Sequence, residues 1–270
     1  MWIDAVGSQH SRADGPARIV SLVPSITELV CEFGLGGQLV GRTGFCVHPR
    51  AALKSVPKVG GTKDIDLAKV RALAPTHVLL NIDENEKRAA AALAQFVPHL
   101  IVTHPLGPLD NPPLYRLIGG IFGQEERAEA LCARFEQAYD ALRQAARAWP
   151  RQSVLYLIWK DPWMTVARDT YISRTLALTG WDTVPAQTAD RYPRVELDQA
   201  LLRDADLVLL ASEPYRFGER HAAELRALPV MHGKPVILID GEMTSWYGSR
   251  AIAGMDYLRR LRTDLEPVAK

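Results

Sequence analysis

The sequence lacks several features that would place it in a common class of protein. Its formal net charge is only +1, so it has no basic excess that would favour nucleic acid or an anionic membrane surface. No apolar run approaches the roughly 20 residues of a membrane span, so we expect no membrane insertion. The three cysteines are odd in number and widely spaced, which predicts no disulfide framework.

The common catalytic and phosphate-binding fingerprints are also absent. Gly34-Leu-Gly-Gly37 ends a predicted helix and does not open one, which argues against a phosphate cradle. There is no Gly-x-Ser-x-Gly elbow, and no spacing connects the serines and histidines into a catalytic triad. We therefore expect a binding protein and not an enzyme.

Residues 1–18 contain no apolar run of the roughly 7–15 residues that a secretory signal needs. As written, the chain is predicted to stay in the cytoplasm. A chain whose leader had been removed, or whose start was misassigned, would look the same, so a periplasmic location is the alternative.

What is present is a repeated alternation of short apolar strands and helices. Strands are expected at 18–23, 38–42, 76–80 and 99–103, and again at 153–159, 207–211 and 235–240. Between the two sets, residues 125–149 form a long helical run without Gly or Pro. This order predicts an α/β fold of two Rossmann-like lobes joined by one long backbone helix, with a ligand cleft between the lobes. The expected boundaries are a flexible N-terminus at 1–17, a first lobe at 18–113, a linking helical segment at 114–149 and a second lobe at 150–270.

Local signals place the ends of some helices. Ser25 and Glu28 match a capping box at the start of the first helix. Three acids that follow predicted strands, Glu84, Glu213 and Glu242, could perform acid–base chemistry or could simply favour the starts of the helices after them.

The loop after the last predicted strand carries two adjacent aromatic residues, Trp246 and Tyr247. Loops at the carboxyl ends of parallel strands are where α/β folds place ligand contacts. We expect this pair to contact a flat, partly apolar ligand, so that replacing both by Ala would spare folding. The alternative is that they cap a hydrophobic core.

Other strand-exit loops bring further aromatic and polar residues toward the same predicted cleft. This mixture suits a large planar ligand with polar edges, and it is too aromatic for a bare ion. A metal-ion receptor built from Cys46, His48 and Glu84 is a weaker alternative, because two or three ligands without a partner motif make a poor site.

Several segments carry a family resemblance. Residues 19–28 (IVSLVPSITE), 59–62 (VGGT), 161–165 (DPWMT), 191–195 (RYPRV) and 245–250 (SWYGSR) resemble, in the same order, motifs of the helical-backbone (class III) periplasmic substrate-binding proteins. That family delivers cobalamin, haem and ferric siderophores to ABC importers, and the cobalamin-binding branch is the most similar. The resemblance covers about residues 18–265.

The resemblance implies a monomeric binding protein with no covalent cofactor. Its ligand would be a corrinoid first, and haem or a ferric siderophore next, and its partner would be an ABC permease. The implied docking acid on the second lobe is Asp198, whereas the first-lobe position falls at Ala68, with Asp66 nearby. The ligand contacts implied by the family, together with two pocket candidates from the strand-exit loops, are Pro24, Ser25, Phe45, Trp163, Tyr192, Glu213, Tyr215, Trp246, Tyr247 and Arg250.

The missing leader motivates a different hypothesis on the same fold. The chain could be a cytoplasmic enzyme or chaperone of corrinoid metabolism that uses Glu213, Glu242 or His48. Conversion of the ligand, or its recovery unchanged, would separate this hypothesis from simple binding.

Overall fold

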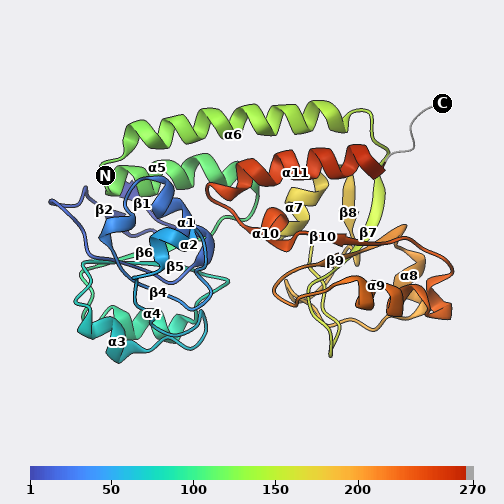
Figure 1. Cartoon of the computed structure of the whole chain (residues 1–270), viewed down its shortest axis with the longest axis horizontal. Helices are drawn as coiled ribbons and strands as arrows, with labels where there is room; N and C mark the ends of the chain where they lie inside the picture. Colours follow the sequence, from blue (N-terminus) through green and yellow to red (C-terminus); the bar gives the residue numbers. More distant parts are fainter. Residues whose placement is uncertain (266–270) are drawn as a thin grey trace. The chain divides into compact units, whose positions relative to one another are not determined.

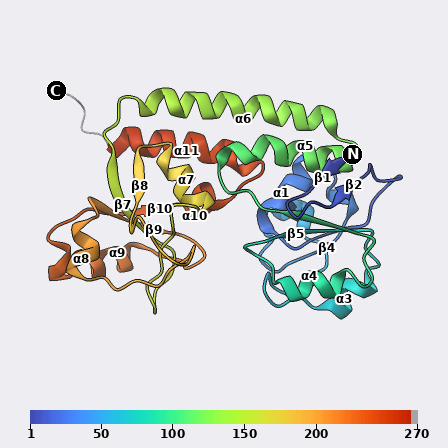
Figure 2. The ribbon, with the colours of Figure 1, turned by 180° about the vertical axis from the view of Figure 1, so that it is seen from behind.

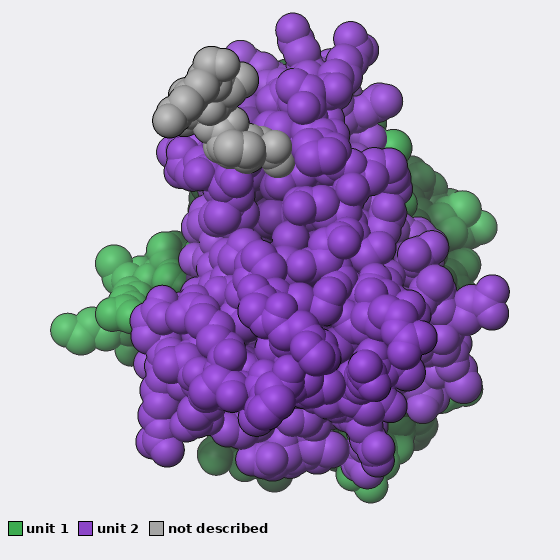
Figure 3. All heavy atoms as spheres, turned by 90° about the vertical axis from the view of Figure 1, so that its right-hand side faces the viewer, with its two compact units in different colours: residues 1–105, 109–135, 247–250 green, residues 106–108, 136–246, 251–270 purple. Residues whose placement is uncertain are grey.

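The computed structural model describes residues 1–265 and contains two parallel four-stranded sheets, each within its own compact unit. Unit 1 comprises residues 1–105, 109–135 and 247–250, and unit 2 comprises 106–108, 136–246 and the chain from Ala251 onward (Figure 3). The two α/β lobes of the predicted fold are therefore present. The division differs from the expected boundaries because a short segment near the C-terminal end, 247–250, belongs to unit 1.

The sheet of unit 1 has the strand order β4-β3-β5-β6, with every neighbouring pair parallel. Helices connect the strands, as the alternation in the sequence predicted. The elements are β3 (Ile19–Ser21), α1 (Pro24–Glu32), η1 (Gly36–Gln38), β4 (Leu39–Arg42), α2 (Arg50–Leu53), α3 (Leu67–Ala72), β5 (His77–Asn81), α4 (Lys87–Leu93), β6 (His99–Thr103), η2 (Pro108–Asp110) and α5 (Asn111–Ile121).

One face of this sheet packs against α3 and α4. Val20 and Val78 on the strands form one buried cluster with Val70 of α3 and Leu93 of α4. Because side chains alternate along a strand, their neighbours point to the opposite face, where Ile19 is also completely buried. Within unit 1, Figure 1 draws α5 on that opposite side of the strands. Helices thus cover both faces, as a parallel sheet requires.

The first 17 residues, predicted to be flexible, contain an antiparallel strand pair, β1 (Trp2–Ile3) and β2 (Gln9–His10). The buried Asp4 carboxylate accepts hydrogen bonds from the backbone N–H groups of Val6, Ser8 and Val102. The Trp2 ring lies so close to Gly120 of α5 that a Cβ at Gly120 would collide with it. These contacts attach the hairpin to unit 1, and no periodic pattern in so short a segment could have indicated them.

The sheet of unit 2 has the strand order β10-β9-β7-β8 and is again entirely parallel. Figure 2 shows the same elements from behind. They are β7 (Gln152–Leu157), α7 (Tyr171–Ala177), β8 (Trp181–Thr183), α8 (Gln199–Arg203), β9 (Leu207–Ala211), α9 (Glu219–Arg226), η3 (Pro229–Met231), β10 (Val236–Ile239), α10 (Gly241–Ser245) and α11 (Arg250–Leu265), the last beginning within unit 1.

The core of unit 2 follows the same alternation. Leu155 and Leu210 on the strands pack with Leu202 of α8 and Leu225 of α9 in one buried cluster. The neighbouring Tyr156 points to the other face, where its hydroxyl lies 2.6 Å from the Thr244 hydroxyl on α10. Each unit therefore buries its own sheet between two helical layers.

The long helix α6 spans Glu125–Ala146, three residues shorter at its C-terminal end than the predicted run to Trp149. Its 22 residues correspond to a length of about 33 Å. The boundary between the units falls within it, after Phe135. Among residues 1–265, none of the helices is both long and apolar enough to cross a membrane.

The predicted capping box at Ser25 is wrong. Helix α1 begins at Pro24, and its N-cap residue, Val23, makes no side-chain hydrogen bond to the helix. Proline at the first position has no N–H to satisfy and already has a helical φ, so the helix can begin without a side-chain cap. The Glu28 carboxylate is bound instead by Arg250.

Candidate functional site

The two sheets share one topology. In each unit the first strand (β3 or β7) lies beside the third (β5 or β9), and the connections that leave these two strands run in opposite directions across the sheet. The carboxyl ends of such a strand pair form the topological switch point, where open α/β sheets place their ligands. The loops after β3 and β5 in unit 1, and after β7 and β9 in unit 2, are therefore the candidate binding loops.

In unit 1, the loop after β3 leads directly into α1. Pro24 is half-buried and Ser25 is buried at the first turn of this nine-residue helix. The next loop along the chain, after β4, carries Phe45, whose side chain is 62% exposed. A phenylalanine that exposed, beside a switch point, provides an apolar surface on which a ligand could lie.

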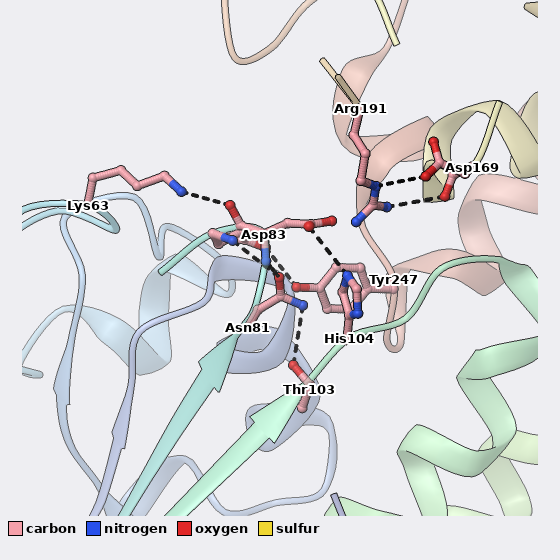
Figure 4. A network of polar contacts seen from close by, with 9 residues as sticks. Lys63, Asn81, Asp83, Thr103, His104, Asp169, Arg191 and Tyr247 are labelled. Carbon is pink, nitrogen blue, oxygen red and sulfur yellow. Dashed lines mark hydrogen bonds and ion pairs between the residues drawn. The ribbon is translucent and has the colours of Figure 1, made fainter. Parts of the chain in front are cut away.

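The loop after β5 is held in shape by its own polar side chains. The Asn81 side-chain oxygen accepts hydrogen bonds from the backbone N–H groups of Asp83 and Glu84. Asp83 pairs with His104 at 3.3 Å, and the Lys63 ammonium donates to the Asp83 carbonyl oxygen (Figure 4). This loop is a preorganised turn, which explains why polar residues follow the strand so closely.

Tyr247 belongs to unit 1, where it closes a hydrogen bond with that turn. Its hydroxyl donates to the Glu84 carboxylate over 2.7 Å, and the side chain is only 7% exposed. Burial, and then the negative charge of Glu84, raise the pKa of the Tyr247 hydroxyl well above its ordinary value. The next residue, Gly248, donates its N–H to Asn111 and accepts from the Tyr115 hydroxyl.

Arg250 completes this attachment to unit 1. Its guanidinium donates two hydrogen bonds to the Glu28 carboxylate, at 2.7 and 2.6 Å, and both side chains are largely shielded from solvent. We call residues 247–250, held by Glu84, Asn111, Tyr115 and Glu28, the anchor segment. The sequence suggested Arg250 as a ligand contact but gave no sign of its partner, which lies 222 positions away.

Cys46 and His48, the weak metal candidates, are placed differently from each other. Cys46 is completely buried, and its sulfur lies 3.0 Å from the Thr27 hydroxyl and 3.2 Å from the Thr43 hydroxyl. Burial raises the pKa of the Cys46 thiol, which opposes the thiolate form that binds metals. His48 is half-buried. Among residues 1–265, no group of three or more His, Cys, Asp or Glu is arranged to hold a metal ion.

In unit 2, the loops after β7 and β9 build a cluster of aromatic rings. Trp159 meets Tyr215 edge-on with ring centroids 5.6 Å apart, and Trp163 stacks nearly parallel on Phe217 at 6.0 Å. Tyr215 and Phe217 are themselves 4.6 Å apart. Trp159 is 40% exposed, while Trp163 and Tyr215 are half-buried against the core. We call these four residues, with His221 beside them, the aromatic cluster.

Tyr192 lies in the loop between β8 and α8, and it is half-buried. The neighbouring backbone pairs with the Trp163 segment, because Val195 N–H donates to the Trp163 carbonyl and Thr165 N–H donates to the Pro193 carbonyl. Arg191 forms an ion pair with Asp169 at 3.6 Å (Figure 4). The residues predicted from the 161–165 and 191–195 motifs are thus brought together within unit 2.

Glu213 and Trp246, both in unit 2, bind each other. One Glu213 oxygen accepts from the Trp246 indole N–H and from the Ser245 hydroxyl, the latter over 3.0 Å. Burial raises the pKa of Glu213 above its ordinary value, and the charge of Glu242 adds to the rise. Trp246 is 8% exposed. Trp246 and Tyr247 are therefore both buried with the polar atom bound to a carboxylate, which favours the alternative that they pack into the core.

Asp198, the implied docking acid, and Asp66, which lies near the first-lobe docking position at Ala68, occupy matching positions in their units. Asp66 caps α3 by accepting from Lys69 N–H, and Asp198 caps α8 by accepting from Leu201 N–H. Each helix precedes the third strand of its sheet. Asp198 is exposed, so its carboxylate can be reached by a basic partner.

Sequence reasoning missed His221. Its Nδ1 accepts from the Gly218 N–H, and its Nε2 lies 3.3 Å from the Tyr215 hydroxyl. The available signal was its position: Gly218 and His221 stand three residues apart at the start of α9, the spacing of a residue that caps a helix by reaching back.

Comparison with known proteins identifies a matching family and related proteins. The model of the family described as "Periplasmic binding protein" matches residues 19–227. The vitamin B12-binding protein of Pectobacterium carotovorum subsp. carotovorum is 24% identical over 254 residues, which cover 93% of this chain and 90% of that protein.

Two solved structures share the fold along nearly the whole chain. The periplasmic vitamin B12-binding protein BtuF of Vibrio cholerae has a TM-score of 0.80 at 20% identity, covering 92% of this chain and 98% of that one. The periplasmic haem-binding protein RhuT of Roseiflexus sp. RS-1, in its apo form, also has a TM-score of 0.80, at 22% identity, covering 93% and 99%. At these identities the likeness establishes the fold.

Proposed function

The chain belongs to the periplasmic binding protein family, and we propose that it binds a large metal chelate, a corrinoid first and haem or a ferric siderophore next. The observation that carries the proposal is the set of aromatic side chains on the loops after β7 and β9, at the switch point of the sheet of unit 2. A broad ligand with a flat apolar face and polar edges matches such loops, whereas a bare ion would leave the rings uncovered. The names of the relatives, which bind vitamin B12 or haem, support the same ligand class.

In unit 2 we propose Trp163, Tyr192 and Tyr215 as ligand contacts. Trp163 and Tyr215 are half-buried, so their rings are already fixed by packing and lose little freedom when a ligand covers them. Covering about 200 Å² of apolar surface would contribute about 5 kcal/mol. Aromatic stacking on a macrocycle would add to this value.

In unit 1 we propose Pro24, Ser25 and Phe45 as contacts. Phe45 is the most exposed of the proposed aromatic contacts. Four further residues remain proposed contacts, ranked below those already named: Glu213, Trp246, Tyr247 and Arg250. Their hydrogen bonds to other residues suggest that they shape the binding loops first and touch the ligand second.

A transport role is part of the proposal. We infer that the chain works in the periplasm and hands its ligand to an ABC permease, with Asp198 of unit 2 and Asp66 of unit 1 as docking acids. Matching positions in the two units support this pairing. An acid on each unit would steer a permease that carries basic residues.

The proposal is tested by titrating the purified chain with cyanocobalamin, dicyanocobinamide, ferric protoporphyrin IX and a ferric siderophore. We expect one of the four to bind far more tightly than about 100 μM, as dedicated receptors do. Trp163→Ala should weaken that ligand at least tenfold, whereas Trp149→Ala, a change outside the binding loops, should leave its affinity unchanged. Failure of all four to bind would refute the proposal, and chemical conversion of the bound ligand would favour the enzyme hypothesis instead.

A further inference from the structure

The hydroxyl of Tyr215 sits at the switch point of unit 2 with an unusual set of neighbours. Tyr215 follows β9, and Trp159 and Trp163 follow β7, which is the adjacent strand. The Tyr215 ring is held on one edge by Trp159 and on its other sides by Phe217 and His221, with centroid distances of 5.6, 4.6 and 5.4 Å. Its backbone N–H donates to the Ile158 carbonyl. The position of its hydroxyl is therefore fixed by the fold.

The proton on His221 is fixed by the backbone. The Gly218 N–H can only donate, and it donates to Nδ1 of His221 over 3.1 Å. Nδ1 must then carry a lone pair, so the ring proton resides on Nε2. Nε2 lies 3.3 Å from the Tyr215 oxygen. His221 is consequently the donor in this contact, and Tyr215 is the acceptor.

This assignment leaves the phenolic proton of Tyr215 available for another partner. A phenol both donates and accepts, and its accepting capacity is used by His221. Among residues 1–265, the Tyr215 hydroxyl has no hydrogen-bond partner other than His221. The hydroxyl is thus a donor held within a ring of aromatic side chains.

We propose that Tyr215 donates this hydrogen bond to a carbonyl or carboxylate oxygen at the edge of the bound chelate, and that His221 is the positioning residue that orients it. The inference rests on the proposed function and refines it by naming the ligand chemistry. The rings of the aromatic cluster take the flat apolar part of the ligand, and Tyr215 reads an oxygen acceptor on its rim. Amide-bearing corrinoids and carboxylate-bearing porphyrins both provide such oxygens.

The specificity that follows is directional. A rim group that accepts a hydrogen bond is favoured over one that can only donate, because the accepting group pairs with the Tyr215 proton. A ligand with no polar rim would bind to the aromatic rings alone. Tyr215 therefore adds selectivity to a surface whose apolar contacts discriminate poorly.

Tyr215→Phe tests the proposal, because it removes only the hydroxyl and keeps the ring contacts. Affinity for whichever of cyanocobalamin, dicyanocobinamide and ferric protoporphyrin IX binds the wild-type chain most tightly should fall about five- to tenfold, the effect expected for one hydrogen bond. His221→Ala should weaken that probe as well. Tyr139→Phe, on α6, is the matched control and should bind like the wild type.

The double variant Tyr215→Phe with His221→Ala separates a positioning role of His221 from a nonspecific loss of stability. If His221 acts through the Tyr215 hydroxyl, His221→Ala should cause no further loss in the Tyr215→Phe background. Equal losses in both backgrounds would overturn the positioning role, and an affinity of Tyr215→Phe within twofold of wild type would overturn the whole inference. A wild-type chain that binds none of the three probes and no ferric siderophore would instead refute the function on which the inference rests.

One further measurement needs no variant. Nitrogen-15 NMR of the wild-type chain should show His221 with its proton on Nε2. A proton on Nδ1 would contradict the hydrogen-bond direction and overturn the inference, even if every variant failed to fold.

Discussion

The Tyr247 hydroxyl donates a 2.7 Å hydrogen bond to Oε1 of Glu84, although 163 positions separate the two residues in the chain. This bond ties the anchor segment to the turn after β5, which is one of the candidate binding loops. The arrangement gives the tyrosine a structural role that its position next to Trp246 concealed. Trp246 and Tyr247 are each buried within their own unit, and each donates its polar hydrogen to a carboxylate.

Tyr247→Phe should therefore destabilise the protein. A buried hydrogen bond to a charged acceptor contributes about 1.5–3 kcal/mol, so the variant should melt several degrees below the wild type. Calorimetry or a far-UV circular dichroism melt measures the effect. The double change Trp246→Ala with Tyr247→Ala should cost considerably more, since truncating a buried aromatic costs about 3–5 kcal/mol per residue. A melting temperature unchanged in either variant would show that these contacts are not made in solution.

The Arg250–Glu28 pair should be worth more than the exposed ion pairs of the same unit. Its side chains are 13% and 20% exposed, whereas those of Arg134 and Glu32 are 58% and 42% exposed. Arg250→Ala leaves the Glu28 carboxylate poorly solvated, so we expect a loss of about 2–4 kcal/mol in the free energy of unfolding. Arg134→Ala is the control, with an expected loss below about 1 kcal/mol. Equal losses in urea titrations of the two variants would contradict this ranking.

Features that depend on neighbouring residues could be predicted from the sequence. Features that depend on contacts between residues far apart in the chain could not. Strands such as 76–80 and 207–211 are apolar runs between breakers, and the long helix has a continuous periodic face, so local pattern predicted them correctly. Trp163 and Tyr215 were correctly placed in strand-exit loops, because both residues follow predicted strands, and their role as ligand contacts stays a prediction. Their actual burial and partners are not local properties.

The errors share a physical cause. Glu28 looked like half of a capping box because Ser25 stands three residues before it, yet its partner is Arg250, 222 residues away. Trp246 and Tyr247 were expected to be dispensable for folding because their carboxylate partners, Glu213 and Glu84, lie in other loops. A local motif competes with tertiary contacts that no single window of sequence contains, and here the tertiary contacts determined the outcome.

His77 should make unit 1 less stable in acid. Burial, together with the nearby charges of His99 and His10, lowers the pKa of His77 from the ordinary 6.5 to about 4. The folded state therefore binds the proton more weakly than the unfolded state. Stability is fully present above about pH 6.5 and is lost as pH falls from there toward about 4.

The loss from His77 should reach about 1–3 kcal/mol at the acid end, after allowance for partial solvent screening. His77→Phe should flatten the dependence of the unfolding free energy on pH in this range, because it removes the titrating ring but retains an aromatic contact with Phe122. His232→Asn, which changes an exposed histidine with a left-handed backbone, is the control. If the pH profile of the Phe variant parallels that of the wild type, His77 is not the group responsible.

Asp198 should reveal two separable roles. Its carboxylate caps α8 through Leu201 N–H at 2.8 Å, so Asp198→Ala should destabilise the protein by about 1 kcal/mol. Asp198→Asn keeps a capping oxygen and removes only the charge, so its stability should match the wild type. If Asp198 also docks a permease, both variants should weaken ligand delivery in a reconstituted transport assay. Normal transport by Asp198→Asn would leave the residue with its capping role alone.

Isothermal titration calorimetry of the purified wild-type chain with cyanocobalamin tests most directly whether this chain binds a large metal chelate. We predict one site per chain with a dissociation constant below about 1 μM. The heat-capacity change of binding should be negative, because the ligand covers apolar surface. The absence of any binding tighter than about 100 μM, for cyanocobalamin and then for dicyanocobinamide, ferric protoporphyrin IX and a ferric siderophore, would contradict the proposed function.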